Sequence, residues 1–368
     1  MFKLSKAEVG IGIVGLGFVG ERAHIPSFHS IVGSKLVAVS DIDIGYAKKV
    51  AEKYRIESVY DSYKDLIRDP KVDAVVISAP TFLHHQIAMY AISSGRHVLC
   101  EIPMAVTMQE AKEMVDAAER SGVIFMPGLN IRFTPNYAKA KMLIEERSIG
   151  NPITVFFREF LAAEVLAQQW PPNSWAWDDQ KSGGGPALTM SLLSFDLLRW
   201  ILQSEIVRVH SVSKDVILHE LGESRGYNCL AILEFSNGAL ASLQFSALVR
   251  PAMSTSRLEI LGDNLNSLVA IGNDRLELYG DNPDKLEWFF KEKGPRVWGH
   301  YQEDEHFIAS ILENKSPVIT GEDALKAQEA AAIVVKGSKS SFQKRDCLAT
   351  NLVEDVTILG NNRRQVEC

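Results

Sequence analysis

Short apolar runs alternate with helical patterns over the first third of the chain. The apolar runs predict strands over residues 9–15, 36–41, 74–79, 97–100 and 124–127. Apolar residues three and four positions apart predict helices over residues 45–54, 63–69, 84–94 and 108–121. This alternation is typical of βαβ units, which build a parallel sheet with helices on both faces. We therefore predict a doubly wound α/β domain over residues 1–130.

The rest of the chain has a different pattern. After a helix expected over residues 136–146, apolar and polar residues alternate, which predicts strands over 153–160, 206–212, 227–235, 239–247, 257–261 and 276–279. Ser236-Asn237-Gly238 between two of these runs predicts a hairpin turn. Further helices are expected over 186–202, 306–314 and 321–341. We predict a second, α+β domain over residues 131–345 with a mainly antiparallel sheet, and a weakly periodic tail over 346–368.

Length and charge narrow the class of protein. The chain of 368 residues is long enough for two domains, and its hydrophobic content of 46% is ordinary for a globular protein. The net charge of −7 leaves no basic excess, so we do not expect nucleic acid as a partner. We find neither a membrane span nor a signal peptide and expect a cytoplasmic protein. The four cysteines lie far apart, which argues against a metal site.

A glycine motif follows the first predicted strand directly. Gly15, Gly17 and Gly20, with Leu16 after the first and Phe18 and Val19 before the third, form a Gly-x-Gly-x-x-Gly sequence that opens a helix. The first glycine makes a tight turn, the second lets backbone N–H groups approach a pyrophosphate, and the third packs helix on strand. This context predicts a Rossmann domain that binds a dinucleotide.

Residues at the ends of two other strands extend this site. Asp41 lies 21 residues after the third glycine, where a carboxylate can bind the ribose 2′-hydroxyl of NAD and would repel the 2′-phosphate of NADP. We therefore predict NAD rather than NADP as the cofactor. Ala79, Pro80, Thr81 and His84 follow a later strand and are candidates for facing the cofactor. Alternatively, Pro80 and Thr81 only end the strand and His84 starts the next helix.

Three further segments are similar to one known family. They are Asn130-x-Arg132-Phe133-x-Pro135, the triplet Gly183-Gly184-Gly185, and the run Asp196-Leu197-Leu198-Arg199-Trp200. Together with the glycine motif they resemble the Gfo/Idh/MocA family over about residues 9–342, nearly the whole chain. The resemblance implies a Rossmann domain and a substrate domain whose open sheet forms an oligomer interface, so we expect a homodimer or homotetramer. It also implies NAD(P)-dependent oxidation or reduction of a sugar, polyol or sugar derivative.

The residues that transfer protons in that family are replaced in this chain. Ile102, between Glu101 and Pro103, stands where the family has lysine, and Thr189 and Leu193 stand where it has aspartate and histidine. Neither isoleucine nor leucine can exchange a proton. By the resemblance, Glu101 and Asn130 join the cofactor site. The residues that we expect to face the substrate are Ile102, Arg132, Trp177, Thr189 and Leu193.

Several charged or polar side chains in segments that resemble the rim of the site could substitute for the missing groups. They are His84, His85, Glu101, Arg132, Glu159, Asp178, Asp179 and Lys181. We predict Glu101 and His84 as the catalytic residues because their positions match site-facing strand ends in the family, with a structural or solvated role as the alternative for each. The tryptophan-rich loop over 169–179 could stack on sugar rings or form a plain hydrophobic interface.

These observations favour an NAD(P)-dependent oxidoreductase of a sugar, polyol or sugar derivative with atypical acid/base residues. Two alternatives keep the fold and the nucleotide. One is a catalytically impaired subunit or sensor that binds NAD(H), and the other is a redox-neutral enzyme, such as a glycosidase, that uses NAD catalytically. Both stay open because the usual proton-transfer residues are replaced. The dehydrogenase remains the favoured function because losing a positioned acid or base slows a reaction by ~100- to 10,000-fold without abolishing it.

Overall fold

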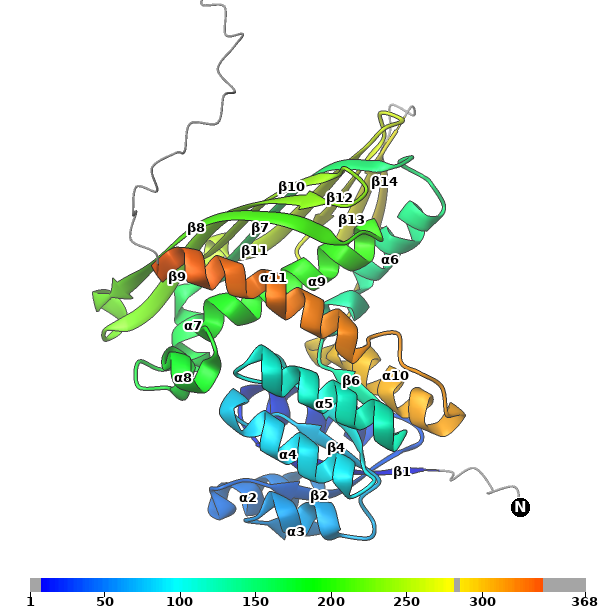
Figure 1. The fold of residues 1–368 in the computed structure, drawn as a ribbon, viewed down its shortest axis with the longest axis vertical. Helices are drawn as coiled ribbons and strands as arrows, with labels where there is room; N and C mark the ends of the chain where they lie inside the picture. The colour runs from blue at the N-terminus through cyan, green and yellow to red at the C-terminus, as the bar shows by residue number, and fades with distance from the viewer. Residues whose placement is uncertain (1–7, 281–284, 340–368) are drawn as a thin grey trace, which may run out of the picture.

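The structure, a computed structural model, describes residues 8–280 and 285–339 and contains two sheets (Figure 1). The first sheet has six parallel strands in the order β3-β2-β1-β4-β5-β6. Every residue of β1 is buried, as expected for a strand covered on both faces. The strands are β1 Val9–Val14, β2 Ser34–Ser40, β3 Ser58–Tyr60, β4 Ala74–Ile77, β5 His97–Cys100 and β6 Phe125–Pro127.

Helical segments connect these strands and pack against the sheet. The connection after β1 starts as a turn of π-helix, and α5 starts with a capping box in which Thr107 and Glu110 each satisfy the backbone N–H of the other. The segments are η1 Gly20–His24, α1 Ile25–Ser30, α2 Ile44–Tyr54, α3 Tyr63–Arg68, α4 Thr81–Ser93, α5 Met108–Ser121 and η2 Asn130–Phe133. The strand order reverses direction between β1 and β4, which is where ligands bind in open α/β sheets.

The second sheet has eight strands in the order β14-β13-β12-β11-β7-β10-β9-β8. Among the described strands, β7 and β10 are parallel and the other neighbours are antiparallel. The strands are β7 Pro152–Ala162, β8 Ile206–Leu218, β9 Ser224–Phe235, β10 Leu240–Val249, β11 Thr255–Gly262, β12 Ser267–Ile271, β13 Arg275–Tyr279 and β14 Leu286–Phe289. The hairpin turn between β9 and β10 contains Gly238 at φ 86°, as predicted.

Helices line the face of the second sheet that looks toward the first (Figure 1). They are α6 Pro135–Glu145, α7 Ala163–Gln169, α9 Gly185–Leu202 and α11 Gly321–Lys339, whereas α8 Asp179–Ser182 and α10 His300–Glu313 pack against other segments. Helix α9 is buried along most of its length against α11 and α6. Three helices contact the first domain: α10 packs against η1 and α1, α11 packs against α5, and α8 packs against α4. Within residues 8–280 and 285–339, no α-helix covers the opposite face of the sheet (Figure 1).

The predicted fold class is confirmed, and the differences are local. Helix α4 begins at Thr81 and not at residue 84, because Pro80 occupies its N-cap and sets the chain for the first turn. Strands β3, β12 and β14, of three to five residues, were not predicted because so short a run shows no period. The predicted tail over 346–368 and residues 340–345 lie outside the described residues. Within the described ranges no helix is long and apolar enough to cross a membrane.

Candidate functional site

A cavity of about 640 Å³ runs along the carboxyl edge of the first sheet. Five successive loops along the sheet contribute to it, after β3, β2, β1, β4 and β5 in spatial order. Eleven of the predicted site residues line it: Gly15, Gly17, Phe18, Val19, Asp41, Ala79, Pro80, Thr81, His84, Glu101 and Ile102. The structure thus brings together residues that are up to 87 positions apart (102 − 15) in the sequence.

The glycine loop has the geometry that each glycine was expected to provide. Gly15 has φ +92°, and a Cβ there would lie 2.5 Å from the backbone N of Ala79. A Cβ on Gly20 would lie 2.4 Å from the carbonyl oxygen of Gly15, so Gly20 supports close packing and does not line the cavity. A Cβ on Gly17 would meet no protein atom within 4 Å and would occupy the cavity instead. The space in front of Gly17 therefore suits a group that approaches the backbone closely.

Asp41 is anchored by the same loop. Its Oδ2 accepts a hydrogen bond from the backbone N–H of Leu16 at 2.8 Å, and its Oδ1 accepts one from Asp43 at 2.9 Å. These two bonds fix the carboxylate at the mouth of the cavity, beside Ile42. A fixed acceptor at this strand end is the arrangement that binds a ribose hydroxyl.

His84 is almost fully buried, and both of its ring nitrogens contact backbone carbonyls. Nε2 lies 2.7 Å from the oxygen of Ala79, and Nδ1 lies 2.9 Å from the oxygen of Pro103. Burial lowers the pKa of His84, and the neutral ring can donate to one of these carbonyls only. Since both nitrogens are engaged within the protein, the structure favours a role for His84 in holding the β4 and β5 loops together.

Glu101 is the carboxylate at the β5 end of the cavity, and it belongs to a buried cluster. Its Oε1 lies 2.9 Å from Nε2 of His24, and Nδ1 of the same ring lies 2.9 Å from Oδ1 of Asp304. Gly128 makes room for the Glu101 side chain, because a Cβ there would lie 3.0 Å from Oε1. The sequence analysis missed His24 and Asp304, which are 280 positions apart. In the sequence, a role for His24 was indicated only by its place four positions after the last glycine of the motif.

The charges in this cluster are set by burial and by mutual contacts. Burial acts to raise the pKa of Glu101, but the hydrogen bond and charge of His24 outweigh it and hold that pKa below its usual range. Burial acts to lower the pKa of His24, but Asp304 and Glu101 raise it well above the ordinary value. Burial raises the pKa of Asp304 to about 6. At neutral pH the cluster therefore contains a protonated His24 between two carboxylates.

Other predicted site residues lie outside this cavity. Arg132, expected to face the substrate, is buried and forms a bidentate ion pair with Asp196, with Nε and Nη2 as donors. A buried guanidinium without that partner would be costly, so this pair ties η2 to α9. Asn130, expected at the cofactor, donates from Nδ2 to the carbonyl oxygen of Trp298 at 2.7 Å. Thr189 and Leu193 lie on α9, and Thr189 Oγ1 donates to the backbone of Gly185.

The tryptophan-rich loop reaches the cavity with two residues that were not singled out. Trp170 and Trp175 line it, and Trp175 makes an edge contact with Phe82 at 6.4 Å between ring centroids. Trp177, the residue predicted to face the substrate, donates from Nε1 to the carbonyl oxygen of Trp170. Its ring is covered by the guanidinium of Arg225 at 5.8 Å. Trp177 thus holds the loop while Trp170 and Trp175 form the cavity wall.

The remaining rim candidates lie in different surroundings. Glu159 on β7 accepts a hydrogen bond from Ser194 of α9 at 2.9 Å, and burial raises its pKa to about 7. His85 pairs with Glu113 on the surface of α4 and α5. Asp178 caps α8 and pairs with Lys181, and Asp179 lies in the same short helix. Within the described ranges, no three His, Cys, Asp or Glu side chains are arranged to hold a metal ion.

Comparison with known proteins identifies the family. Residues 9–129 match the "Oxidoreductase family, NAD-binding Rossmann fold", and residues 137–265 match the "GFO/IDH/MocA C-terminal domain". The oxidoreductase YrbE of Bacillus subtilis (strain 168) is 30% identical over 335 residues, which are 88% of this chain and 92% of that protein. Myo-inositol 2-dehydrogenase of Thermotoga maritima is 26% identical over 91% of this chain and 96% of that protein.

Solved structures show the same fold. Levoglucosan dehydrogenase in complex with NADH and levoglucosan aligns with a TM-score of 0.78 at 22% identity, over 90% of this chain and 97% of that chain. A myo-inositol 2-dehydrogenase from Lactobacillus plantarum aligns with a TM-score of 0.75 at 24% identity, over 90% and 97%. The chain therefore belongs to the Gfo/Idh/MocA oxidoreductase family, and its N-terminal part is the NAD-binding Rossmann fold of that family.

Proposed function

We propose that this protein is an NAD-dependent dehydrogenase that oxidises a hydroxyl, or reduces a carbonyl, of a sugar or polyol. The observation that carries the proposal is the single cavity along the carboxyl edge, which joins the glycine loop and Asp41 to Glu101 and an aromatic wall. Relatives named as myo-inositol, scyllo-inositol and levoglucosan dehydrogenases support the substrate class.

The residues present fit a dinucleotide. Asp41 would hold the adenosine ribose, and the backbone around Gly17 would hold the pyrophosphate, where a side chain is absent and the space is open. The nicotinamide half would then extend past Thr81 toward Glu101, since these loops follow in order along the sheet. When bound, NAD supplies the hydride acceptor. The carboxylate of Asp41 favours NAD over NADP because it would repel a 2′-phosphate.

Glu101 is the group best placed to exchange the proton. Its carboxylate lines the cavity and is ionised at neutral pH because of His24, so it can accept a proton from a substrate hydroxyl as the hydride leaves. His84 has no free ring nitrogen to offer. Ile102 lines the cavity beside Glu101 and contributes apolar surface only.

The aromatic wall suits a ring-shaped, hydroxylated substrate. Trp170 and Trp175 come from the loop after α7 and face the β4 loop across the cavity. Aromatic faces stack on the C–H surface of sugar rings, while the hydroxyl groups keep polar partners.

A direct test begins with the purified protein. It is denatured, any released nucleotide is identified by mass spectrometry, and the redox state of bound or added NAD is followed with a panel of sugars, polyols and nucleotide sugars. A redox change with one compound is the expected result. Bound NAD that no compound alters would favour a subunit or sensor, turnover of a glycoside without net redox change would favour a glycosidase, and no affinity for NAD(H) would refute the proposal.

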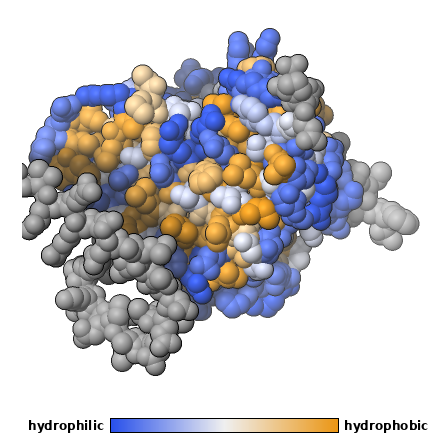
Figure 2. Space-filling model, turned by 90° about the horizontal axis from the view of Figure 1, so that it is seen from above, coloured by the Kyte–Doolittle hydropathy of each residue, from blue (hydrophilic) through white to orange (hydrophobic). Residues whose placement is uncertain are grey.

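We further propose that a second copy of this chain covers the open face of the second sheet. Hydrophobic side chains gather on this face (Figure 2), and they include Phe156, Val212, Leu230, Ile232 and Leu240, each 47% to 73% exposed. They alternate with inward-facing residues along each strand, as they would on a sheet packed on both faces. Exposed apolar patches of this kind mark protein–protein contacts.

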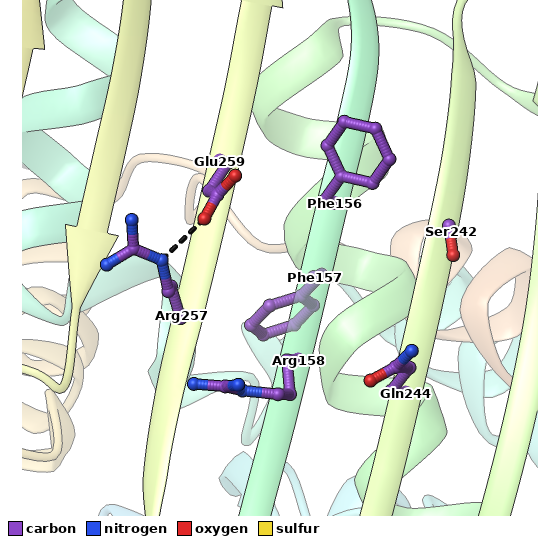
Figure 3. Close-up of a pocket in the computed structure, with 7 residues that line it drawn as sticks. All are labelled: Phe156, Phe157, Arg158, Ser242, Gln244, Arg257 and Glu259. Carbon is purple, nitrogen blue, oxygen red and sulfur yellow. Dashed lines mark hydrogen bonds and ion pairs between the residues drawn. The ribbon is translucent and has the colours of Figure 1, made fainter.

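The polar residues of this face suit a twofold contact. A shallow hollow of about 380 Å³ lies over β7, β10 and β11, with Arg158 beside the pair formed by Arg257 and Glu259 (Figure 3). The Nε of Arg158 is buried without a hydrogen-bond partner. Because a twofold interface places one patch against its own copy, a patch with both arginine and glutamate can be complementary to itself. Sedimentation should show a dimer or tetramer, dissociated by Ile232→Glu; a monomer at micromolar concentration would refute this proposal.

A further inference from the structure

The cluster behind Glu101 joins the two domains. His24 comes from η1 directly after the glycine loop, whereas His300, Glu303 and Asp304 come from α10, near the C-terminal end of the described chain. His24 and Asp304 are fully buried, and Glu101 is the member that lines the nucleotide cavity, with 15% of its side chain exposed. The cavity wall is therefore backed by ionisable groups that cannot reach solvent directly.

The hydrogen bonds define the protonation of this cluster. Each ring nitrogen of His24 contacts a carboxylate, and an ionised carboxylate can only accept hydrogen bonds. Both nitrogens must therefore carry a proton when Glu101 and Asp304 are both ionised. In this state the ring is a cation between two anions, and its two bonds fix the orientation of Glu101 toward the cavity.

The other ionisable groups around the cluster do not supply a second cation. The His300 ring stands edge-on to His24 at 5.8 Å, and burial lowers its pKa to about 4. Both carboxyl oxygens of Glu303 are buried without a hydrogen-bond partner, and burial raises its pKa well above the ordinary value. His84, on the other side of Glu101, is neutral for the reason given above. At neutral pH the cluster thus has one cation, His24, and two anions, of which only Glu101 faces the cavity.

The order of the loops places Glu101 at the nicotinamide end of the cofactor. Asp41 lies after β2, the glycine loop after β1 and Glu101 after β5, with β4 between them in the sheet. Neighbouring strands are ~4.8 Å apart, so Asp41 and Glu101 are about three strand spacings, or ~14 Å, from each other. With the ribose at Asp41 and the pyrophosphate at the glycine loop, the nicotinamide is the part left for the β5 end. Its ring is positively charged in NAD⁺ and neutral in NADH.

We propose that His24 and Asp304 are positioning residues that keep Glu101 as an oriented carboxylate at the nicotinamide end, and that this fixed charge makes the site prefer NAD⁺ over NADH. The inference rests on the proposed function, because it assumes that NAD(H) occupies the cavity. The carboxylate of Glu101 attracts the positively charged nicotinamide ring of NAD⁺ more strongly than the neutral ring of NADH. We expect this attraction to change the ratio of the NAD⁺ and NADH dissociation constants by about tenfold. A purely structural cluster would affect both cofactor forms equally.

The test compares the dissociation constants for NAD⁺ and NADH between pH 6 and 8.5 by calorimetry. Glu101→Gln should shift the ratio by about tenfold toward NADH at every pH. In the His24→Asn variant, Glu101 lacks the neighbouring cation that keeps it ionised. The ratio should therefore stay near that of the wild type at pH 8.5, where Glu101 is still ionised, and approach that of Glu101→Gln at pH 6, where Glu101 takes up a proton. His85→Asn is the matched control: it removes a surface histidine–glutamate pair outside the cavity and should change nothing.

A second measurement does not depend on any variant folding. The ring nitrogen shifts of His24 in the wild-type protein, measured by NMR, should report a doubly protonated ring at pH 8. A neutral His24 at pH 7, or an equal effect of Glu101→Gln on both cofactor forms, would overturn the inference while leaving the proposed function intact. Failure of the wild-type protein to bind either nucleotide would overturn both.

Discussion

The two ends of the nucleotide cavity are built in different ways. At the β1–β2 end, the site consists of backbone N–H groups, open space at Gly17, and one carboxylate on Asp41 held by the neighbouring loop. All of it comes from residues close together in the sequence. At the β5 end, the one charged group is Glu101, and the partners that fix it come from His24 and from Asp304, 203 positions further on (304 − 101).

This difference separates binding from chemistry. The β1–β2 end depends on main-chain geometry, which tolerates little change and is shared with other dinucleotide sites. The β5 end depends on side chains and not on main-chain geometry, and there Ile102 lines the cavity beside Glu101. The proposed function accordingly assigns cofactor binding to the β1–β2 end and proton transfer to Glu101 at the β5 end. Three predictions test this separation, and a fourth concerns a buried carboxylate outside the cavity.

The largest effect is expected at the β5 end. With a responsive sugar or polyol, Glu101→Gln should lower kcat by ~100- to 10,000-fold, because it removes the proposed proton acceptor. His84→Gln should lower kcat by less than about tenfold, since its ring nitrogens contact backbone carbonyls and not the substrate. Steady-state measurement of kcat for the two variants shows which of the two residues accepts the proton. A larger loss for His84→Gln would show that our assignment of the proton acceptor is wrong.

At the β1–β2 end, filling the space before Gly17 should weaken cofactor binding without affecting the fold. Gly17→Leu should reduce NADH affinity by roughly 100-fold, because the side chain would occupy the position of the pyrophosphate. Gly17→Ala adds a smaller side chain and serves as the control; it should reduce NADH affinity less than Gly17→Leu does. Since a Cβ at this position meets no protein atom within 4 Å, both variants should keep the thermal unfolding midpoint of the wild type. Unchanged NADH fluorescence titrations for Gly17→Leu would place the pyrophosphate elsewhere.

A smaller effect is expected for the choice between NAD and NADP. Asp41→Ala should weaken NADH binding by about tenfold, since it removes a charged acceptor for the ribose hydroxyl, and should improve NADPH binding by relieving repulsion. Titration of both nucleotides measures the change in selectivity. Asp43→Ala is a suitable control because Asp43 caps α2 outside the cavity. An equal loss of affinity for NADH and NADPH would indicate that Asp41 stabilises the glycine loop and does not select the cofactor.

The smallest effect concerns Glu159 and the pH dependence of stability. Burial raises the pKa of Glu159 from 4.5 to about 7, so the folded protein binds this proton more tightly than the unfolded chain. The associated stability is fully present below about pH 4.5 and is lost as the pH rises through about 7. Glu159→Gln should therefore be more stable than the wild type by about 1 kcal/mol at pH 8, after allowance for partial exposure, and show little gain at pH 4.5. Thermal unfolding at the two pH values tests this, and an equal gain at both would show that Glu159 is not protonated on folding.

The sequence alone determined the Rossmann domain, the mainly antiparallel second sheet and the glycine-loop end of the cavity. Hydrophobic periodicity identifies buried strands wherever a run is long enough, as for β1 and β9, because burial on a sheet repeats with a fixed period. The roles of Gly15, Gly17 and Asp41 follow from local geometry after one strand and the next. These positions need no information about distant parts of the chain.

Only the tertiary structure decided which side chains face the reacting end. It showed Arg132 in a buried pair with Asp196 of α9, outside the residues that line the cavity, because the two opposite charges satisfy each other inside the protein. It showed that Trp170 and Trp175 line the cavity, whereas Trp177 stabilises their loop by donating a hydrogen bond to the carbonyl oxygen of Trp170. It also joined His24 to Asp304 through the packing of α10 on η1. Residues so far apart in the sequence leave no periodic pattern or fixed spacing from which their contact could be predicted. Such contacts depend on how the two domains pack together.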